Sequence, residues 1–210
     1  MSTGAIPSSA KIDSRTGRIL SASERLFLER GYMATSMSLV AQQAAVSKTT
    51  LYTRFPSKEE LFVATIQTAC ARYGADLAPE TLADLPLEEA LYQAGRRFVE
   101  LLWSPEAIKT RQSAVSEASR MPEVGRLYFD AGPQRILSGL TALFARFARR
   151  EAVRIDDPAF TARQFLAVLL GDHYCALELG LCDPPTGEER DAFARRAVTL
   201  FVRGLHNGTA

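Results

Sequence analysis

The spacing of the apolar residues constrains this chain most, because it repeats with the period of an α-helix in every long segment. An alternation of apolar and polar residues between turn signals, which is typical of a strand, does not occur in the sequence. The pattern therefore predicts an all-α fold of about nine helices.

The first 58 residues are predicted to form three helices. The first covers about 15–30 and is followed by Gly31, in the place of a left-handed C-terminal cap. A second begins after Ser36, and a third covers about 48–55 and ends before Pro56. Two helices joined by a tight turn are the plan of a helix-turn-helix, whose second helix enters the major groove of DNA. We expect this motif at about 36–55, within an N-terminal domain of residues 1–58.

Residues 59–210 are predicted to form a second, C-terminal domain that is a bundle of helices. A capping box at residues 57–60 opens a long helix, and residues 76–86 have the composition of a linker. Two long helices are expected at the end of the chain, over about 158–181 and 187–205. The first of these is apolar on more than one side, which predicts burial against a partner as well as against its own core.

Charge is distributed unevenly along the chain. Residues 1–58 carry eight Lys and Arg against three acids, whereas the whole chain has a formal net charge of only +1. A basic N-terminal part on a mildly acidic body is typical of a module that faces phosphate and is attached to one that faces protein. The alternative is a chance clustering of basic residues.

Residues 36–62 read SMSLVAQQAAVSKTTLYTRFPSKEELF. This segment resembles the DNA-binding head of TetR regulators, typically TxxxIAxxAGVSKGTLYxYFxSKExL, and the resemblance covers about residues 15–65. It implies a regulator, in most relatives a repressor, that binds a palindromic operator as a homodimer and is released by a small-molecule inducer. Ala45 and Thr49 stand where the family has glycine. Ala45 must hold a conformation that costs roughly 1 kcal/mol, or the turn bends differently, and Thr49 is expected to change operator preference.

The predicted DNA contacts lie in and around the motif. Ser36 can offer a hydroxyl to phosphate, and Lys48 brings a positive charge to the DNA backbone. The threonines of the third helix can reach base edges or thymine methyls, and Arg54 can contact guanine or phosphate. The resemblance places Tyr52 and Lys58 against phosphate. The alternative is a helical hairpin with a solvated basic face. The expected contacts are Ser36, Ser47, Lys48, Thr49, Thr50, Tyr52, Thr53, Arg54 and Lys58.

The resemblance also implies a dimer interface on the last two long helices and an inducer pocket within the body. Two further segments, MPEVGRLYFDAGP and RQFLAVLLGD, resemble the C-terminal domain of AefR-type regulators. The interface candidates are Phe165, Leu169, His173, Leu177, Phe193, Ala197, Leu200 and Phe201. The pocket candidates, each of which also fits an ordinary core position, are Phe62, Ile66, Tyr73, Phe98, Leu102, Trp103, Tyr128 and Tyr174.

Other classes of protein have little support in the sequence. His173 between Asp172 and Tyr174 is not a proton relay, because adjacent residues of a helix point in different directions. The three cysteines lack C-x-x-C spacing, and a glycine-rich phosphate loop is missing, so we expect no enzyme, metal site or cofactor. Without a long apolar run or a signal peptide we expect a cytoplasmic protein that does not bind membranes. The competing function is a helical dimeric interaction protein that does not bind an operator.

Overall fold

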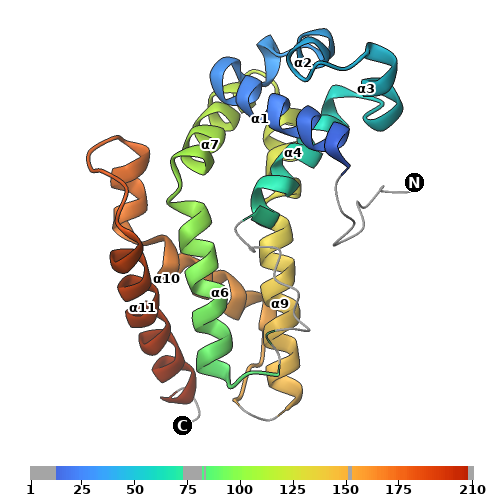
Figure 1. Ribbon diagram of the computed structural model, residues 1–210. Coiled ribbons are helices and arrows are strands. Elements are labelled where there is room, and N and C mark those ends of the chain that lie inside the picture. The colour runs from blue at the N-terminus through green and yellow to red at the C-terminus, as the bar shows by residue number, and fades with distance from the viewer. Residues whose placement is uncertain (1–12, 73–81, 83, 151–152, 208–210) are drawn as a thin grey trace. The chain divides into compact units, whose positions relative to one another are not determined.

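A computed structural model describes residues 13–72, 82, 84–150 and 153–207 of the chain. Within these ranges every regular element is a helix and no strand occurs, which confirms the predicted all-α fold. Tyr73 and most of the expected linker at 76–86 lie outside the described residues. The helices are α1 (Ser14–Ala34), α2 (Met37–Gln43), α3 (Lys48–Arg54), α4 (Lys58–Arg72), α6 (Leu87–Leu102), α7 (Pro105–Ala118), α8 (Pro122–Ala131), α9 (Pro133–Arg149), α10 (Pro158–Glu178) and α11 (Gly187–Asn207) (Figure 1).

Internal contacts divide the chain into two compact units. Unit 1 consists of residues 1–69 and 110–131, and unit 2 consists of residues 70–109 and 132–210. The predicted domain boundary after residue 58 lies inside unit 1, and the place where the chain divides functionally stays a prediction.

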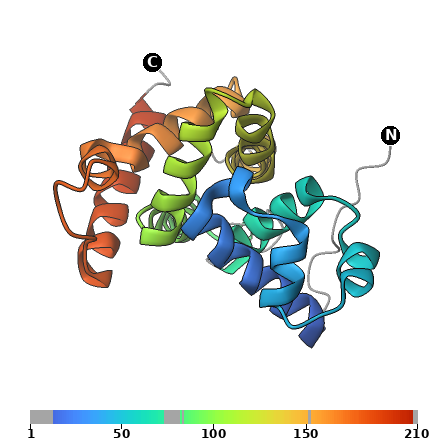
Figure 2. The same ribbon diagram turned by 90° about the horizontal axis from the view of Figure 1, so that it is seen from above.

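Figure 2 shows α1, α2 and α3 of unit 1, coloured blue to teal, lying close to one another, and their buried side chains form a small apolar core. Ile19, Val40 and Leu51 from these three helices are fully buried. The ring of Phe62 on α4 packs edge-on against Phe27, with 5.1 Å between the ring centroids. On α1 the buried Ile19, Ala22 and Leu26 lie three or four positions apart, so this helix presents one apolar stripe to the shared core.

The helix starts of unit 1 follow the capping pattern that the sequence predicts. Ser36 accepts a hydrogen bond from Leu39 N at 3.2 Å and caps α2, and Ser47 accepts one from Thr50 N at 3.0 Å and caps α3. A hydroxyl at the cap satisfies one of the free N–H groups at a helix start. Helix α3 ends at Arg54, directly before Phe55 and Pro56, as predicted.

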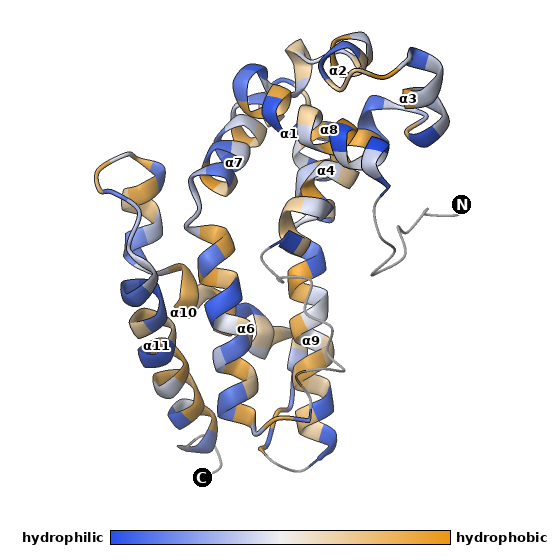
Figure 3. Cartoon of the chain, viewed as in Figure 1, coloured by the Kyte–Doolittle hydropathy of each residue, from blue (hydrophilic) through white to orange (hydrophobic). Residues whose placement is uncertain are grey.

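Unit 2 contains α6, α9, α10 and α11, and α6 packs against both α10 and α11. Phe144 on α9 and Phe165 on α10 are fully buried, with 5.9 Å between their ring centroids. Gly95 allows the approach of α6, since a Cβ there would lie 3.3 Å from a methyl group of Leu169. Hydrophobic and hydrophilic residues lie on different sides of α6 and α9 (Figure 3), as expected for helices that share one core.

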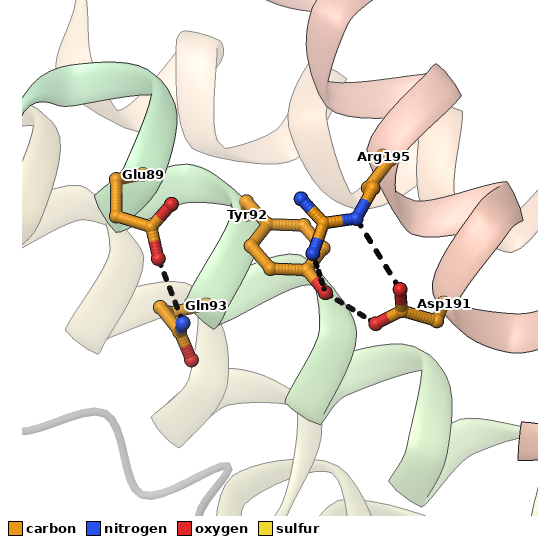
Figure 4. A network of polar contacts seen from close by, with 5 residues as sticks. All are labelled: Glu89, Tyr92, Gln93, Asp191 and Arg195. Carbon is orange, nitrogen blue, oxygen red and sulfur yellow. Dashed lines mark hydrogen bonds and ion pairs between the residues drawn. The ribbon is translucent and has the colours of Figure 1, made fainter. Parts of the chain in front are cut away.

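A polar cluster also joins α6 to α11 (Figure 4). The hydroxyl of Tyr92 donates to Asp191, and Arg195 donates to the Tyr92 oxygen at 2.9 Å and to Asp191 at 3.3 Å. The pKa of Tyr92 is raised mainly by burial and, to a smaller extent, by the hydrogen bond to Asp191. The same hydrogen bond lowers the pKa of Asp191. The three side chains therefore hold the start of α11 against α6.

None of the helices in the described residues has the length and the apolar character that crossing a membrane requires.

Candidate nucleic-acid interface

Helix α3 presents one exposed polar face. Lys48, Thr49, Tyr52 and Thr53 are exposed, and they follow the i, i+1, i+4, i+5 spacing of a single helix face. Leu51 is completely buried on the other side and anchors the helix in the core of unit 1. A helix of seven residues fixed in this way can enter the major groove with its polar face toward the bases.

The hydroxyl groups of α3 are partly used within the helix. Thr50 and Ser47 hydroxyl oxygens lie 2.8 Å apart, so these two side chains complete the cap. Thr53 donates its hydroxyl to the carbonyl oxygen of Thr49 at 2.8 Å. The Thr53 side chain, which is exposed, therefore keeps its methyl group and an acceptor lone pair for a base edge.

The turn between α2 and α3 contains a left-handed residue. Ala45 has φ 54° and is the one non-glycine residue with positive φ in the described part of the chain. Around it, Val46 N donates to the carbonyl oxygen of Ala41 at 3.0 Å and closes the turn. Of the two possibilities for this alanine, the chain takes the first: Ala45 holds the costlier left-handed conformation.

Arg54, predicted to contact guanine or phosphate, is bound within unit 1. Its guanidinium donates to Asp13 at 2.6 Å and to the Thr16 hydroxyl at 3.0 Å. Hydrogen bonds from the Thr16 backbone and then from Arg54 hold the pKa of the Asp13 carboxyl far below its usual range. Arg54 thus braces the end of α3 against the start of α1. The sequence did not indicate this, because the partners are about 40 residues apart.

Lys58 is also bound within unit 1. Its ammonium group donates to the carbonyl oxygens of Tyr32 at 3.0 Å and Thr35 at 3.1 Å, and it lies 4.2 Å from the centre of the Tyr32 ring. A lysine that takes up the carbonyl groups at a helix end acts as a C-terminal cap for α1. A phosphate contact by Lys58 stays a prediction. Ser36, by contrast, is exposed at the start of α2.

The pocket candidates are divided between the two units. Phe62, Ile66 and Tyr128 belong to unit 1, where Phe62 and Ile66 are buried. The indole of Trp103 is buried in unit 2 between His173 and Phe193, with ring centroids 5.0 and 4.8 Å away. Its Nε1 is the one buried side-chain polar atom without a hydrogen-bond partner in the described part of the protein. The remaining unit 2 candidates are Phe98 and Tyr174, which are buried, and Leu102, which is half-buried.

The interface candidates also differ in exposure. Leu200 on α11 is 69% exposed, whereas four candidates are buried within the chain itself, namely Phe165, Leu169, Leu177 and Ala197. His173, Phe193 and Phe201 are half-buried. Other large apolar side chains are exposed along α10 and just beyond it, namely Phe160, Val168, Leu170, Leu179 and Leu181. In the described ranges, His, Cys, Asp and Glu form no group of three that could hold a metal ion.

Two family profiles match the chain in the order of its expected domains. Residues 19–65 match the profile of bacterial regulatory proteins of the tetR family. Residues 89–204 match the C-terminal domain of AefR-like transcriptional repressors. Together they cover the helix-turn-helix and most of the helices after it.

Individual proteins agree with these profiles. The chain is 32% identical to the HTH-type transcriptional regulator YhgD of Bacillus subtilis over 150 residues, 69% of this chain and 74% of YhgD. It is similar to the crystal structure of a TetR-family transcriptional regulator from Mesorhizobium loti, with TM-score 0.75 and 25% identity over 93% of this chain and 98% of that one. It is also similar to the flavonoid-responsive regulator FrrA, with TM-score 0.70 and 30% identity over 90% of this chain and 96% of that one.

Proposed function

Because the chain belongs to the TetR family of DNA-binding transcriptional regulators, we propose that it is a repressor that binds a palindromic operator as a homodimer and is released by a small molecule. The observation that carries this proposal is the polar face of α3, where Lys48, Thr49, Tyr52 and Thr53 are exposed together. Lys48 and Tyr52 would contact phosphate and the threonines would contact bases. Its place of action would be the cytoplasm, where bacterial operators lie.

A homodimer is supported by the apolar surface of unit 2. Leu200 on α11 and Phe160 on α10 are 69% and 56% exposed, although large apolar side chains on helices are usually covered. A second copy related by a two-fold axis would cover this surface and place two copies of α3 on one palindromic site. We propose that the exposed residues of α10 and α11, rather than the buried ones, form the centre of the contact.

A small-molecule inducer is supported by one relative and by one atom of unit 2. FrrA, a similar structure, is a flavonoid-responsive regulator. The unpartnered Nε1–H of Trp103 is a buried donor that a ligand oxygen could satisfy. We therefore propose an aromatic inducer with an oxygen acceptor and choose the flavonoid naringenin as the first probe.

The competing proposal is a dimeric interaction protein whose head does not bind DNA. The exposed Lys48 and Tyr52 favour DNA binding, because neither side chain has a packing role on that face. The two proposals predict different salt dependence. Phosphate contacts give a steep linear fall of log affinity with log salt concentration, whereas a protein partner gives no such slope for a DNA probe.

The test is selection of bound fragments from a random duplex library, with the Lys48→Ala, Tyr52→Ala double variant as the control. We expect one palindromic site for the natural sequence and a loss of about tenfold or more in affinity for the variant. A reporter gene behind the selected site should be silenced by the protein. Activation of the reporter would overturn the repressor assignment, and failure to enrich any site at low salt would overturn operator binding.

A further inference from the structure

Glu117, near the C-terminal end of α7, holds the backbone at the end of α1. One carboxylate oxygen accepts a hydrogen bond from Tyr32 N at 2.7 Å, and the other accepts one from Met33 N at 3.1 Å. The two residues are about 85 positions from Glu117 in the sequence. A carboxylate that receives two backbone N–H groups forms a strong, directional contact, because the acceptor is charged and both oxygens are used.

The chain is shaped for this contact at Gly31. This residue has φ 78° and ψ 173°, a conformation that is almost restricted to glycine. A Cβ at Gly31 would lie 2.2 Å from the Glu117 Oε1 atom. The backbone conformation therefore requires glycine at this position, and a Cβ there would displace the Glu117 carboxylate from where it lies.

Residues of helix α4 bind the other polar groups of the same turn. Lys58 donates to the carbonyl oxygens of Tyr32 and Thr35, and the Tyr32 hydroxyl donates to Glu59 at 3.0 Å. The amide, the carbonyl and the side chain of Tyr32 are thus all bound by residues of α4 and α7. The next residue after this turn is Ser36, the cap of α2, and α2 packs on the recognition helix α3.

Helix α7 belongs to both compact units. Residues 105–109 group with unit 2 and residues 110–118 group with unit 1, within one continuous helix. Trp103, the single tryptophan of the chain, lies in unit 2 two residues before α7 begins. A helix transmits a displacement of one end to the other because its backbone hydrogen bonds keep it stiff.

We propose that Glu117 is the positioning residue through which α7 sets the conformation of the turn between α1 and α2. Through this turn it also sets the orientation of the exposed polar face of α3. This inference rests on the proposed function, since it names the residue that links the body of the regulator to its DNA-binding head. Thermodynamic linkage makes the link reciprocal, so that operator binding acts back through Glu117 on the start of α7.

Reciprocity gives a test that needs no inducer. The full-length protein is titrated with the selected operator duplex, and binding is followed by the anisotropy of labelled DNA while Trp103 emission reports on unit 2. We expect the emission to change with operator occupancy in the natural sequence. In Glu117→Ala the operator should still bind, with affinity reduced about tenfold, and the emission response should be lost.

Two variants separate this role from a merely structural one. Glu117→Gln keeps the shape and one acceptor oxygen, so it should restore part of the emission response that Glu117→Ala loses. Glu123→Ala removes an exposed glutamate of the neighbouring helix α8 and should behave like the natural sequence. A natural protein whose emission ignores the operator, or a Glu117→Ala variant whose emission responds fully, would overturn the proposal.

Hydrogen exchange of the free protein supplies a measurement that is independent of any operator. The peptide that contains the Tyr32 and Met33 amides should exchange about tenfold faster in Glu117→Ala than in the natural sequence or in Glu123→Ala. Unchanged exchange would overturn the contact itself. If the natural protein binds no duplex, the proposed function fails, and exchange still decides whether Glu117 holds the turn.

Discussion

Each unit of this regulator contains a tyrosine whose hydroxyl donates to a carboxylate and whose ring lies beneath a cation, and the two clusters are connected differently. In unit 1, Tyr32 donates to Glu59, and the Lys58 ammonium lies 4.2 Å from its ring centre. In unit 2, Tyr92 donates to Asp191, and the Arg195 guanidinium carbon lies 3.9 Å from its ring centre.

The cations make the difference. Arg195 binds the same tyrosine and the same carboxylate, so its cluster is closed and joins only α6 and α11. Lys58 instead binds backbone carbonyl groups, and Glu117 binds the backbone amide of Tyr32. The cluster of unit 1 therefore fixes the conformation of a chain turn and joins three helices, whereas that of unit 2 fastens two helices that already share an apolar core. We expect changes in unit 1 to have the larger effects.

We expect the largest effects on stability at the two glycines that interrupt a helix. Gly31 and Gly171 both have positive φ, and a Cβ would meet a carboxylate oxygen at 2.2 Å in the first case and a ring carbon of Phe193 at 3.4 Å in the second. Gly31→Ala should lower the free energy of unfolding by about 3 kcal/mol, and Gly171→Ala by about 2 kcal/mol. Urea unfolding measures both. Equal losses of unfolding free energy in the two variants would contradict our expectation that changes in unit 1 have the larger effects.

The second comparison removes the cations. Lys58→Met leaves two carbonyl groups without their charged donor, and should lower the free energy of unfolding by about 2 kcal/mol. Arg195 is 61% exposed. Arg195→Met should therefore have roughly half that effect or less, because water replaces an exposed ion pair. Lys48→Met on the exposed face of α3 is the control and should leave stability unchanged. A larger loss from Arg195→Met would reverse our ranking of the clusters.

The third comparison uses alkaline pH. The pKa of Tyr32 is raised above its usual value of 10.0, mainly by burial and, to a smaller extent, by the hydrogen bond to Glu59. The pKa of Tyr92 is raised too, first by burial and then by Asp191. A raised pKa stabilises the fold fully below the unfolded value, and this stability is lost as the pH rises from about 10 through the folded value. Unfolding measured between pH 8 and 11 should show this fall, and Tyr32→Phe should reduce it more than Tyr92→Phe. A pH-independent free energy of unfolding would contradict the assignment.

The smallest expected effects come from exposed ion pairs, one in each unit. Arg54 and Asp13 lie 2.6 Å apart in unit 1, and Arg150 and Asp84 lie 3.0 Å apart in unit 2. Asp13→Asn and Asp84→Asn should each change the melting temperature by less than about 2 °C. Asp13→Asn should also tighten operator binding about threefold, because it removes a negative charge from the head and releases Arg54, whereas Asp84→Asn should not. Weaker operator binding by Asp13→Asn would indicate that the brace itself is needed.

Local sequence signals predicted where the helices begin. Thr186 and Glu189 form the reciprocal capping box that their spacing indicates, and Asp157 caps α10 directly before Pro158. These features depend on residues within one helical turn of each other, so the sequence contains all the information that is needed. The all-α fold follows in the same way from the apolar period.

Contacts between distant segments could not be predicted in this way. Nothing near Lys58 in the sequence indicates that its partners are the carbonyl groups of Tyr32 and Thr35. Apolar spacing also does not distinguish a core from an interface. Ala197 and Leu200 lie one turn apart on α11, yet the first is buried and the second is exposed. Only the packing of the other helices decides which apolar residues remain available to a partner.

The left-handed alanine in the turn of the helix-turn-helix leaves room for improvement of the head. Ala45 carries a Cβ in a left-handed backbone conformation that glycine adopts without steric strain, and the strain amounts to roughly 1 kcal/mol. Proteins are selected to exceed a stability threshold rather than to reach an optimum, so such residues persist. For an engineer who wants a heat-tolerant biosensor, Ala45→Gly is a substitution that relieves the strain in the turn and leaves the exposed polar face of α3 unchanged.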